Sequence, residues 1–206
     1  MRIVPGMIRI TTAVAFSLLI AASASAQTSE FGILAGGSKR LISHSDEAAG
    51  RGVSDSFKFD NTVREIYYSI ALEPGTRFKI KAGQITAPVA FQFSGPNGNI
   101  RSDLAKGKIE HIDGLIDYRF SEAFGSTGLF AGVGLYRQSG TITDAAVPTD
   151  LRGHQEETNY GFSGGVNGDF PLNRRAGIIV EATYHAINYH YRPRYITLTG
   201  GLRYSF

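Results

Sequence analysis

Two histidines and two tyrosines near the C-terminus are the side chains whose types could support acid–base or metal chemistry. His185 and His190 lie five positions apart, and Tyr189 and Tyr191 flank the second histidine. A histidine can serve as a general base or as a metal ligand. Side chains five positions apart on a β-strand point to opposite faces, so the spacing argues against a shared metal site. The simpler interpretation is a strand-end histidine that hydrogen-bonds to its neighbours or to solvent.

No motif for cofactor binding or hydrolysis is present in the sequence. A phosphate-binding loop, a dinucleotide fingerprint, an H-E-x-x-H pair and a G-x-S-x-G elbow are all absent. The absence of cysteine excludes disulfides, thiolate metal sites and cysteine nucleophiles. The formal net charge is only +3, and no basic stripe with interleaved aromatic residues indicates a nucleic-acid partner. We therefore expect no catalytic residue, no cofactor and no metal.

One short stretch, His185-Ala186-Ile187-Asn188, resembles the H-x-S-N stretch of the lipid A deacylases, which are small outer-membrane barrels that end in phenylalanine. The resemblance implies a general base at His185 and a nucleophile at position 187. Ile187 stands at that position, and an isoleucine side chain cannot attack an ester. The protein is therefore predicted not to be an enzyme, and a lipid A-modifying activity is the alternative.

The last twelve residues alternate strictly between apolar and polar side chains. The apolar set shares one face and comprises Ile196, Leu198, Leu202, Tyr204 and Phe206. A period of two predicts a β-strand with one apolar face, and an ordinary amphipathic edge strand is the alternative. The ending resembles the closing strand of bacterial outer-membrane β-barrels. The resemblance implies that Tyr204 and Phe206 belong to the signal that the barrel-assembly machinery recognises.

The first residues of the chain predict a secretory signal peptide. Arg2 and Arg9 precede an apolar run at 13–22, and this run is too short for a membrane anchor. Small residues then form the site that a signal peptidase reads, so we expect cleavage between Ala26 and Gln27. The predicted organisation is a signal peptide at 1–26 and one barrel domain at 27–206.

The rest of the chain divides into about eight segments of about ten residues, each alternating in polarity. Transmembrane strands need only about 9–11 residues, and no segment is apolar enough over its length to be a membrane helix. Long and short connections alternate, as they do in bacterial outer-membrane barrels. The sequence therefore predicts an all-β fold, a closed antiparallel transmembrane β-barrel in an up-and-down meander. The predicted external loops are Arg40–Asn61, Phe91–Lys108 and Ser139–Glu157, and a bulge is expected near Ile85.

The polar faces of these strands carry charges of both signs. If the apolar faces meet lipid, the charges fill a lumen that is just wide enough for side chains. Buried charges must be paired and hydrogen-bonded, so we expect a polar network that plugs the lumen, with a narrow water or ion path as the alternative. Inward glycines near Phe130 and Tyr136 indicate aromatic rings packed over glycine. The predicted lumen network comprises Glu65, Arg77, Lys79, Lys81, Asp113, Asp117, Arg119, Asp169, Glu181 and Arg203.

The alternating strands, the rhythm of the connections and the closing strand together resemble the small outer-membrane barrels of the OmpA and OmpX types. The resemblance implies residence in the bacterial outer membrane, among lipid and lipopolysaccharide, after escort by periplasmic chaperones and insertion by the barrel-assembly machinery. It also implies a structural or surface-interaction role through external loops whose ligand the sequence does not name. A narrow small-solute channel is one alternative, and a soluble lipocalin-like barrel in the periplasm is another.

Overall fold

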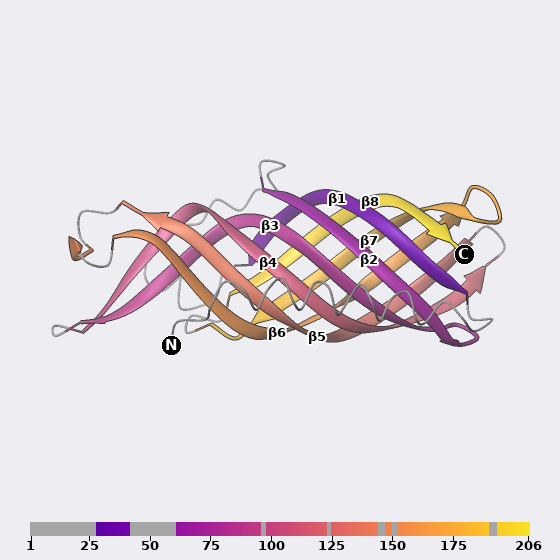
Figure 1. The fold of residues 1–206 in the computed structure, drawn as a ribbon, viewed down its shortest axis with the longest axis horizontal. Coiled ribbons are helices and arrows are strands. Elements are labelled where there is room, and N and C mark those ends of the chain that lie inside the picture. Colours follow the sequence, from indigo (N-terminus) through magenta and orange to yellow (C-terminus); the bar gives the residue numbers. More distant parts are fainter. Residues whose placement is uncertain are drawn as a thin grey trace.

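Eight antiparallel strands follow one another along the chain and close into a barrel (Figure 1). The structure is a computed structural model, which describes residues 28–41, 61–95, 98–122, 125–143, 147–149, 152–189 and 193–206. Within these ranges no helix is long and apolar enough to cross a bilayer. Each strand pairs with the next and the last pairs with the first, which confirms the predicted all-β, up-and-down barrel of eight strands.

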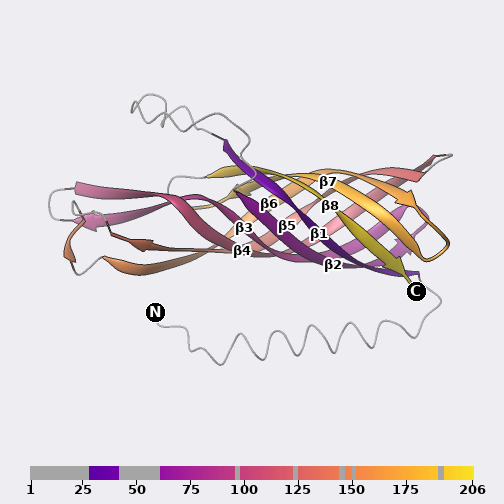
Figure 2. The same ribbon diagram turned by 90° about the horizontal axis from the view of Figure 1, so that it is seen from above.

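The strands differ in length, and the four in the middle of the chain are the longest. They are β1 (Ser29–Leu41), β2 (Thr62–Glu73), β3 (Thr76–Gly95), β4 (Gly98–Glu122), β5 (Gly125–Ile142), β6 (Gly153–Pro171), β7 (Ala176–Ile187) and β8 (Arg194–Ser205). As a result, the β3–β4 and β5–β6 pairs project beyond the other strands at one end of the barrel (Figure 2).

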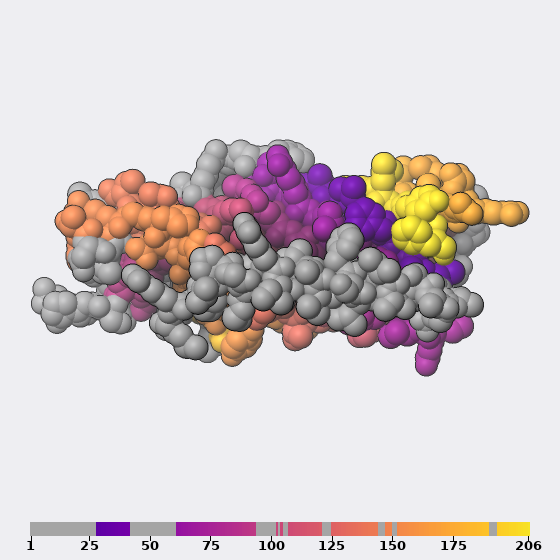
Figure 3. All heavy atoms as spheres, viewed as in Figure 1, coloured from indigo at the N-terminus to yellow at the C-terminus, as the bar shows by residue number. Residues whose placement is uncertain are grey.

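The two ends of the barrel are different. At one end, here called the turn end, short turns join β2 to β3, β4 to β5 and β6 to β7, and the chain terminates there (Figure 1). Gly75 lies in the first of these turns with a φ of 80°, in the left-handed region that favours glycine. The opposite end, here called the loop end, holds the projecting strand pairs. In the space-filling view the yellow residues of β8 lie at the opposite end from the orange β5–β6 pair (Figure 3).

Two of the three predicted external loops are wrong, because much of each is strand. The pairing of β3 with β4 continues to Gly95 and Gly98, inside the predicted loop Phe91–Lys108. Likewise β5 continues to Ile142 and β6 begins at Gly153, inside the predicted loop Ser139–Glu157. Backbone hydrogen bonding can continue where lipid no longer requires apolar side chains, so the alternation fades before the strand ends.

The predicted loop Arg40–Asn61 is tested only at its two borders. Arg40 and Leu41 still belong to β1, where they pair with β8, so the connection begins later than the sequence predicts. Residues 42–60 of this connection lie outside the described part of the chain.

The register of the strands sets the width of the lumen. Cα partners followed once around the barrel from Glu30 lead back to β1 at Arg40, ten residues further along the strand. Strand number and stagger together fix the diameter of a barrel, and eight strands leave an interior that side chains can fill. Every inward-facing side chain is therefore within reach of residues on several other strands.

The predicted bulge near Ile85 is present slightly further along β3. Ile85 pairs regularly with Ile109, and the register of β3 against β4 shifts only between Ala87 and Val89. Pro88 lies at this shift, where a residue without a backbone N–H is tolerated. Because Ile85, Ala87 and Val89 are all buried, β3 keeps its phase and its inward face changes from charged to apolar.

The outer face of the barrel is apolar, which is the reverse of a soluble protein. Ile33, Val133 and Leu202 are 58%, 68% and 63% exposed. Toward the turn end the exposed side chains include aromatic rings, as in the girdles of membrane barrels. An apolar belt of this extent is unfavourable in water and favourable in a bilayer. The alternative of a soluble lipocalin-like barrel, which needs a polar exterior, is contradicted. The aromatic residues at the turn end include Tyr118, Phe120, Phe170, Tyr204 and Phe206.

Candidate functional site in the barrel lumen

Charged side chains fill the turn-end half of the lumen, and this set is here called the charged layer. Strict alternation along each strand directs them inward, opposite the lipid-facing side chains. The structure places all ten predicted lumen residues there and adds two that the sequence reasoning missed, Glu30 and His111. The charged layer comprises Glu30, Glu65, Arg77, Lys79, Lys81, His111, Asp113, Asp117, Arg119, Asp169, Glu181 and Arg203.

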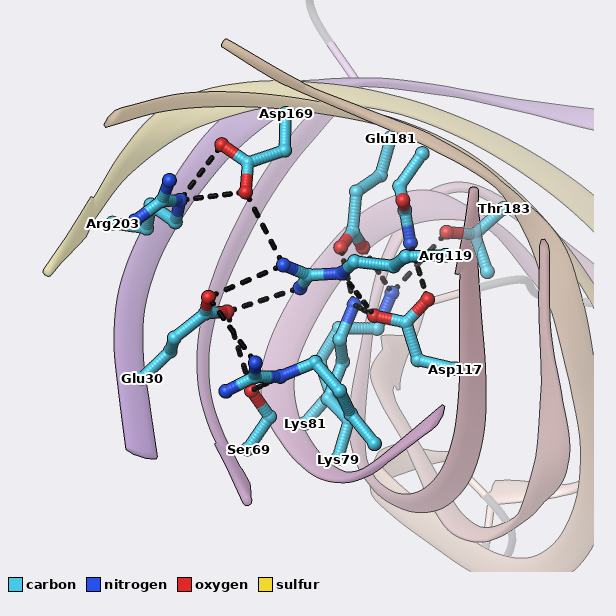
Figure 4. A network of polar contacts seen from close by, with 12 residues as sticks. Glu30, Ser69, Lys79, Lys81, Asp117, Arg119, Asp169, Glu181, Thr183 and Arg203 are labelled. Atoms are coloured by element: carbon cyan, nitrogen blue, oxygen red, sulfur yellow. Dashed lines mark hydrogen bonds and ion pairs between the residues drawn. The ribbon is translucent and has the colours of Figure 1, made fainter. Parts of the chain in front are cut away.

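Three arginines bridge two carboxylates nearest the turn end, and Figure 4 labels two of them, Arg119 and Arg203. Arg119 lies between the two, 3.0 Å from Glu30 and 3.2 Å from Asp169. Arg203 binds Asp169 at 2.7 Å, and Arg77 lies 3.5 Å from Glu30. These contacts join β1, β3, β4, β6 and β8. They therefore hold strands that are not neighbours at fixed relative levels along the barrel.

Two lysines and their carboxylate partners form the centre of the charged layer (Figure 4). Lys79 lies 2.8 Å from Glu181 and 3.3 Å from Asp117. Lys81 lies 3.2 Å from the other oxygen of Glu181 and 3.6 Å from Glu65. All five side chains are completely buried. Charges this far from water persist only because each has partners of opposite sign.

Aromatic rings close the space around the two lysines. The ammonium group of Lys79 lies 4.9 Å from the ring centres of both Tyr67 and Phe130, a distance at which cations attract aromatic faces. The Phe130 ring occupies the space opposite Gly165, where a Cβ atom would approach the ring to 3.0 Å. The same holds for Tyr136 and Gly161 at 2.8 Å. The predicted packing of these two rings over glycine is thus present.

His111 is held between two carboxylates and completes the charge balance. Its Nδ1 lies 2.6 Å from Asp113 and its Nε2 lies 3.3 Å from Glu65. A neutral imidazole has one nitrogen without a proton, which would then face a carboxylate oxygen. The charged layer holds six carboxylates against five lysine and arginine side chains. A protonated His111 would supply the sixth positive charge.

A second, apolar set of inward side chains lies beyond the charged layer toward the loop end, and is here called the apolar cap. The sequence reasoning predicted a polar lumen, and this is wrong for the loop-end half. The sequence feature that could have indicated the apolar cap is the alternation of Ile85, Ala87 and Val89 in β3. It was interpreted as an irregularity of the strand. The apolar cap comprises Val63, Ile85, Ala87, Val89, Phe91, Ile109, Tyr136, Ile142, Val147, Ile187, Tyr189 and Tyr195.

Hydrogen bonds from tyrosines hold the apolar cap to the strands around it. Tyr195 donates to the carbonyl of Pro88 at 3.0 Å, and Tyr189 donates to the carbonyl of Tyr136 at 3.0 Å. Tyr136 joins the two parts of the lumen, because its ring packs in the apolar cap while its hydroxyl donates to Asp113 at 2.7 Å. The side chains of the apolar cap are 0–4% exposed, so they are packed away from solvent.

Solved structures with this architecture are known, although neither family models nor curated protein sequences match the chain. The crystal structure of Neisserial surface protein A (NspA) aligns over 88% of this chain and 98% of its own, with 14% identity and a TM-score of 0.53. The attachment invasion locus protein Ail of Yersinia pestis aligns over 87% and 97%, with 10% identity and a TM-score of 0.48. The chain has the fold of a small outer-membrane β-barrel. At this identity the likeness concerns the fold alone.

The histidine singled out as a possible general base faces the lumen of this outer-membrane barrel fold. His185 is fully buried, 3.0 Å from the Tyr136 hydroxyl and 3.3 Å from the Thr197 hydroxyl. Ile187 shares its inward face and belongs to the apolar cap. A lipid at the outer surface has no access to either side chain. Of the other residues considered, Tyr189 is buried in the apolar cap, whereas His190 and Tyr191 lie outside the described residues.

No metal site emerges from the described part of the lumen. In those ranges, no group of three or more histidine, aspartate and glutamate side chains has an arrangement suited to a metal ion. His111, Asp113 and Glu65 approach one another closely, but both imidazole nitrogens are directed at carboxylates. The chemistry that this site can perform is therefore charge pairing and proton sharing within the barrel.

Proposed function

We propose that the protein is an integral outer-membrane barrel that acts through its loop end, with the barrel serving as a membrane anchor whose lumen is closed. The observation that carries this proposal is the apolar belt around a closed barrel whose charged layer faces inward. A closed barrel satisfies every strand edge internally, as a lipid environment requires. Membrane fractionation followed by electrophoresis of boiled and unboiled samples tests it: a folded barrel sediments with the outer membrane and migrates differently when unboiled.

The projecting strand pairs are the surface through which the protein would meet a partner. Toward the loop end, outward side chains of β4, β5 and β6 are charged and form ion pairs. Glu110 contacts Lys108 at 2.6 Å, and Arg137 contacts both Glu110 and Glu156. The hydrogen bond from Arg137 lowers the pKa of the Glu156 carboxyl, so this pair stays charged in mildly acidic surroundings. The proposed role is surface interaction through two ordered hairpins together with the remaining external connections.

The closed lumen distinguishes this proposal from a narrow channel. The two central lysines of the charged layer are ion-paired, and the buried side chains of the apolar cap lie between them and the loop end. Silence of the purified barrel in planar bilayers supports closure, and discrete conductance steps would favour the channel. The proposal is also non-enzymatic, because His185 and Ile187 are buried in the lumen. An altered lipid A mass profile on expression would contradict that part.

Export and assembly complete the proposal. Residues 1–26, with the cleavage site between Ala26 and Gln27, lie outside the described residues and are proposed as the signal peptide. Tyr204 and Phe206 face outward at the end of the barrel, 42% and 71% exposed, with their rings 5.3 Å apart. An exposed aromatic pair at this place supports recognition by the barrel-assembly machinery. The proposed surroundings are outer-membrane lipid and lipopolysaccharide, reached with the help of periplasmic chaperones.

Deleting Phe206 is expected to reduce the amount of assembled barrel in the outer membrane several-fold. The intrinsic cost is small, since the residue contributes one backbone hydrogen bond to Ser29, worth about 1 kcal/mol, and an exposed ring. The deletion variant should therefore still fold in detergent micelles. Leu202→Ala, an outward change on the same strand, is the control and should assemble normally. Normal cellular assembly of the deletion variant would contradict the recognition role.

An arginine at Val133 is expected to destabilise the barrel by about 2–4 kcal/mol in lipid vesicles. Val133 is 68% exposed within the apolar belt, where a charge would lose its hydration. Urea unfolding in vesicles measures the change. Thr158→Arg is the matched control, because Thr158 is also outward and exposed but lies beyond the apolar belt. Equal effects of the two substitutions would count against a membrane around Val133.

A further inference from the structure

Several buried polar atoms in the charged layer or beside it have no hydrogen-bond partner among the described residues. They include the Tyr67 hydroxyl, the amide oxygen of Asn167 and the Thr199 hydroxyl. Glu65 is held by ion pairs only, and neither of its carboxylate oxygens accepts a hydrogen bond. Leaving a buried polar atom without a hydrogen bond costs about 1–3 kcal/mol. Buried polar groups are nearly always satisfied by protein or by ordered water, so several at one place indicate water.

These atoms gather around the central carboxylate of the charged layer. Glu181 is the direct cross-strand partner of both Asn167 and Thr199, so all three side chains face the lumen at one level. The Tyr67 ring lies against Lys79, which is itself bound to Glu181. Water can both donate and accept hydrogen bonds, and a buried water molecule typically makes about three. The unpaired atoms around Glu181 are mostly acceptors or hydroxyls, which water can bridge.

Solvent accessibility within the lumen declines from the turn end inward. The side chains of Arg77, Arg203 and Arg119 are 12%, 10% and 9% exposed. The side chains of Lys79 and Glu181, which lie deeper in the lumen, are not exposed to solvent. In Figure 4, Arg203, Asp169 and Glu30 lie on one side of the network, and Lys79, Lys81 and Glu181 lie on the other. Water therefore meets a polar route from the turn end, along charged groups that can exchange contacts with it.

In the opposite direction the inward side chains of β2, β3 and β4 are apolar and closely packed. Ile85 and Ile109 face each other across β3 and β4 in the apolar cap, and both are fully buried. Val63, on the neighbouring strand, pairs with Ile85 and is 1% exposed. Apolar constrictions stop ions and water by excluding water, without any charged barrier.

We propose that the lumen is a blind well, which binds water in the charged layer, opens only at the turn end and is sealed by the apolar cap. The ligand of this well is water, held by Glu65, Tyr67, Asn167 and Thr199. The inference goes beyond the closed lumen proposed above, because it assigns the barrier to the apolar cap and not to the ion pairs. It rests on the proposed placement in a membrane, which the conductance measurement requires.

Water-edited solid-state NMR of the barrel in lipid tests the hydrated half of the proposal. Polarisation from water should reach the side chains of Lys79, Lys81 and Tyr67 quickly, and should reach Ile85 and Val63 slowly. Equally slow transfer to both groups would mean that the charged layer is dry, and would overturn the water site. Equally fast transfer to both would mean that the apolar cap does not exclude water, and would overturn the seal.

Single-channel recording tests the seal itself. The double variant Ile85→Ser with Ile109→Ser replaces two facing apolar side chains of the apolar cap by hydroxyls. We expect discrete conductance steps from this variant and none from the wild-type barrel. The matched control is Ile66→Ser with Ile112→Ser, which makes the same change on the lipid-facing surface of β2 and β4 and should stay silent.

The outcomes separate this inference from the proposed function. A cap variant that keeps the mobility of a folded barrel when unboiled, yet stays silent, would overturn the assignment of the barrier to the apolar cap. Closure of the wild-type lumen would then still stand. Conductance from the wild-type barrel would overturn both closure and seal. A cap variant that fails to fold is replaced by Val63→Ser, a milder change in the same row, with the same two outcomes.

Discussion

Replacing Glu181 with glutamine is expected to destabilise the barrel by about 3–5 kcal/mol, the range for breaking a buried ion pair on one side. Among the described residues, Glu181 is the carboxylate that contacts both buried lysines, at 2.8 Å from Lys79 and 3.2 Å from Lys81. Glutamine keeps the shape of the side chain but removes its charge. The two ammonium groups would then lie close together with one carboxylate partner each. Urea unfolding in lipid vesicles, followed by unboiled electrophoretic mobility, measures the loss.

The same substitution at an exposed ion pair provides the control. Glu156 pairs with Arg137 at the loop end, and its side chain is 42% exposed. Exposed pairs contribute about 0–1 kcal/mol, so Glu156→Gln should change stability little. If Glu181→Gln proves as mild as Glu156→Gln, the charged layer does not hold the barrel together and its role must lie elsewhere.

Replacing His111 with leucine is expected to cost a similar amount, about 3–5 kcal/mol. Leucine fills much of the volume but removes the positive charge between Glu65 and Asp113. The charged layer would then carry one uncompensated negative charge in a site without exposure. The measurement is again urea unfolding in lipid vesicles. His154→Leu is the matched control, because His154 contacts Glu156 on the exposed surface and should cost less than about 1 kcal/mol.

A double-mutant cycle separates the charge of His111 from its packing. If His111 is the sixth cation, neutralising one neighbouring carboxylate should be less harmful once the histidine is gone. Glu65→Gln should therefore cost less in the His111→Leu background than in the wild-type barrel, since contacting residues do not add independently. Additive costs would show that His111 contributes by packing and not by charge.

The strands themselves could be predicted because lipid imposes a strict rule on one face. In β5 every second residue from Leu129 to Leu135 is apolar, and the structure places Leu129, Val133 and Leu135 outward. The inward direction of Lys79 and Glu181 follows from the same period, without any knowledge of their partners. The rule weakens where lipid ends. The outer parts of β3–β6 were therefore predicted as loops, although backbone pairing continues through them.

The partners inside the lumen could not be predicted, because alternation states which way a side chain points but not at what level it lies. Lys79 and Glu181 are separated by about a hundred residues, and the stagger of ten residues around the barrel brings them together. Glu30 was missed because it stands at the very start of β1, where a single charge gives no period. His111 was missed because its role as a charge depends on two carboxylates from different strands.

The sequence by itself determined that this protein is a membrane-type barrel, since a period of two with one apolar face recurs along the chain and matches strands surrounded by lipid. It also determined that ten of the twelve side chains of the charged layer would enter the lumen. Only the tertiary structure decided that the lumen has two halves. Alternation alone does not distinguish the charged layer from the apolar cap. Their separation along the lumen depends on the register that closes β8 on β1. Register is a property of the closed barrel, so no single strand contains it.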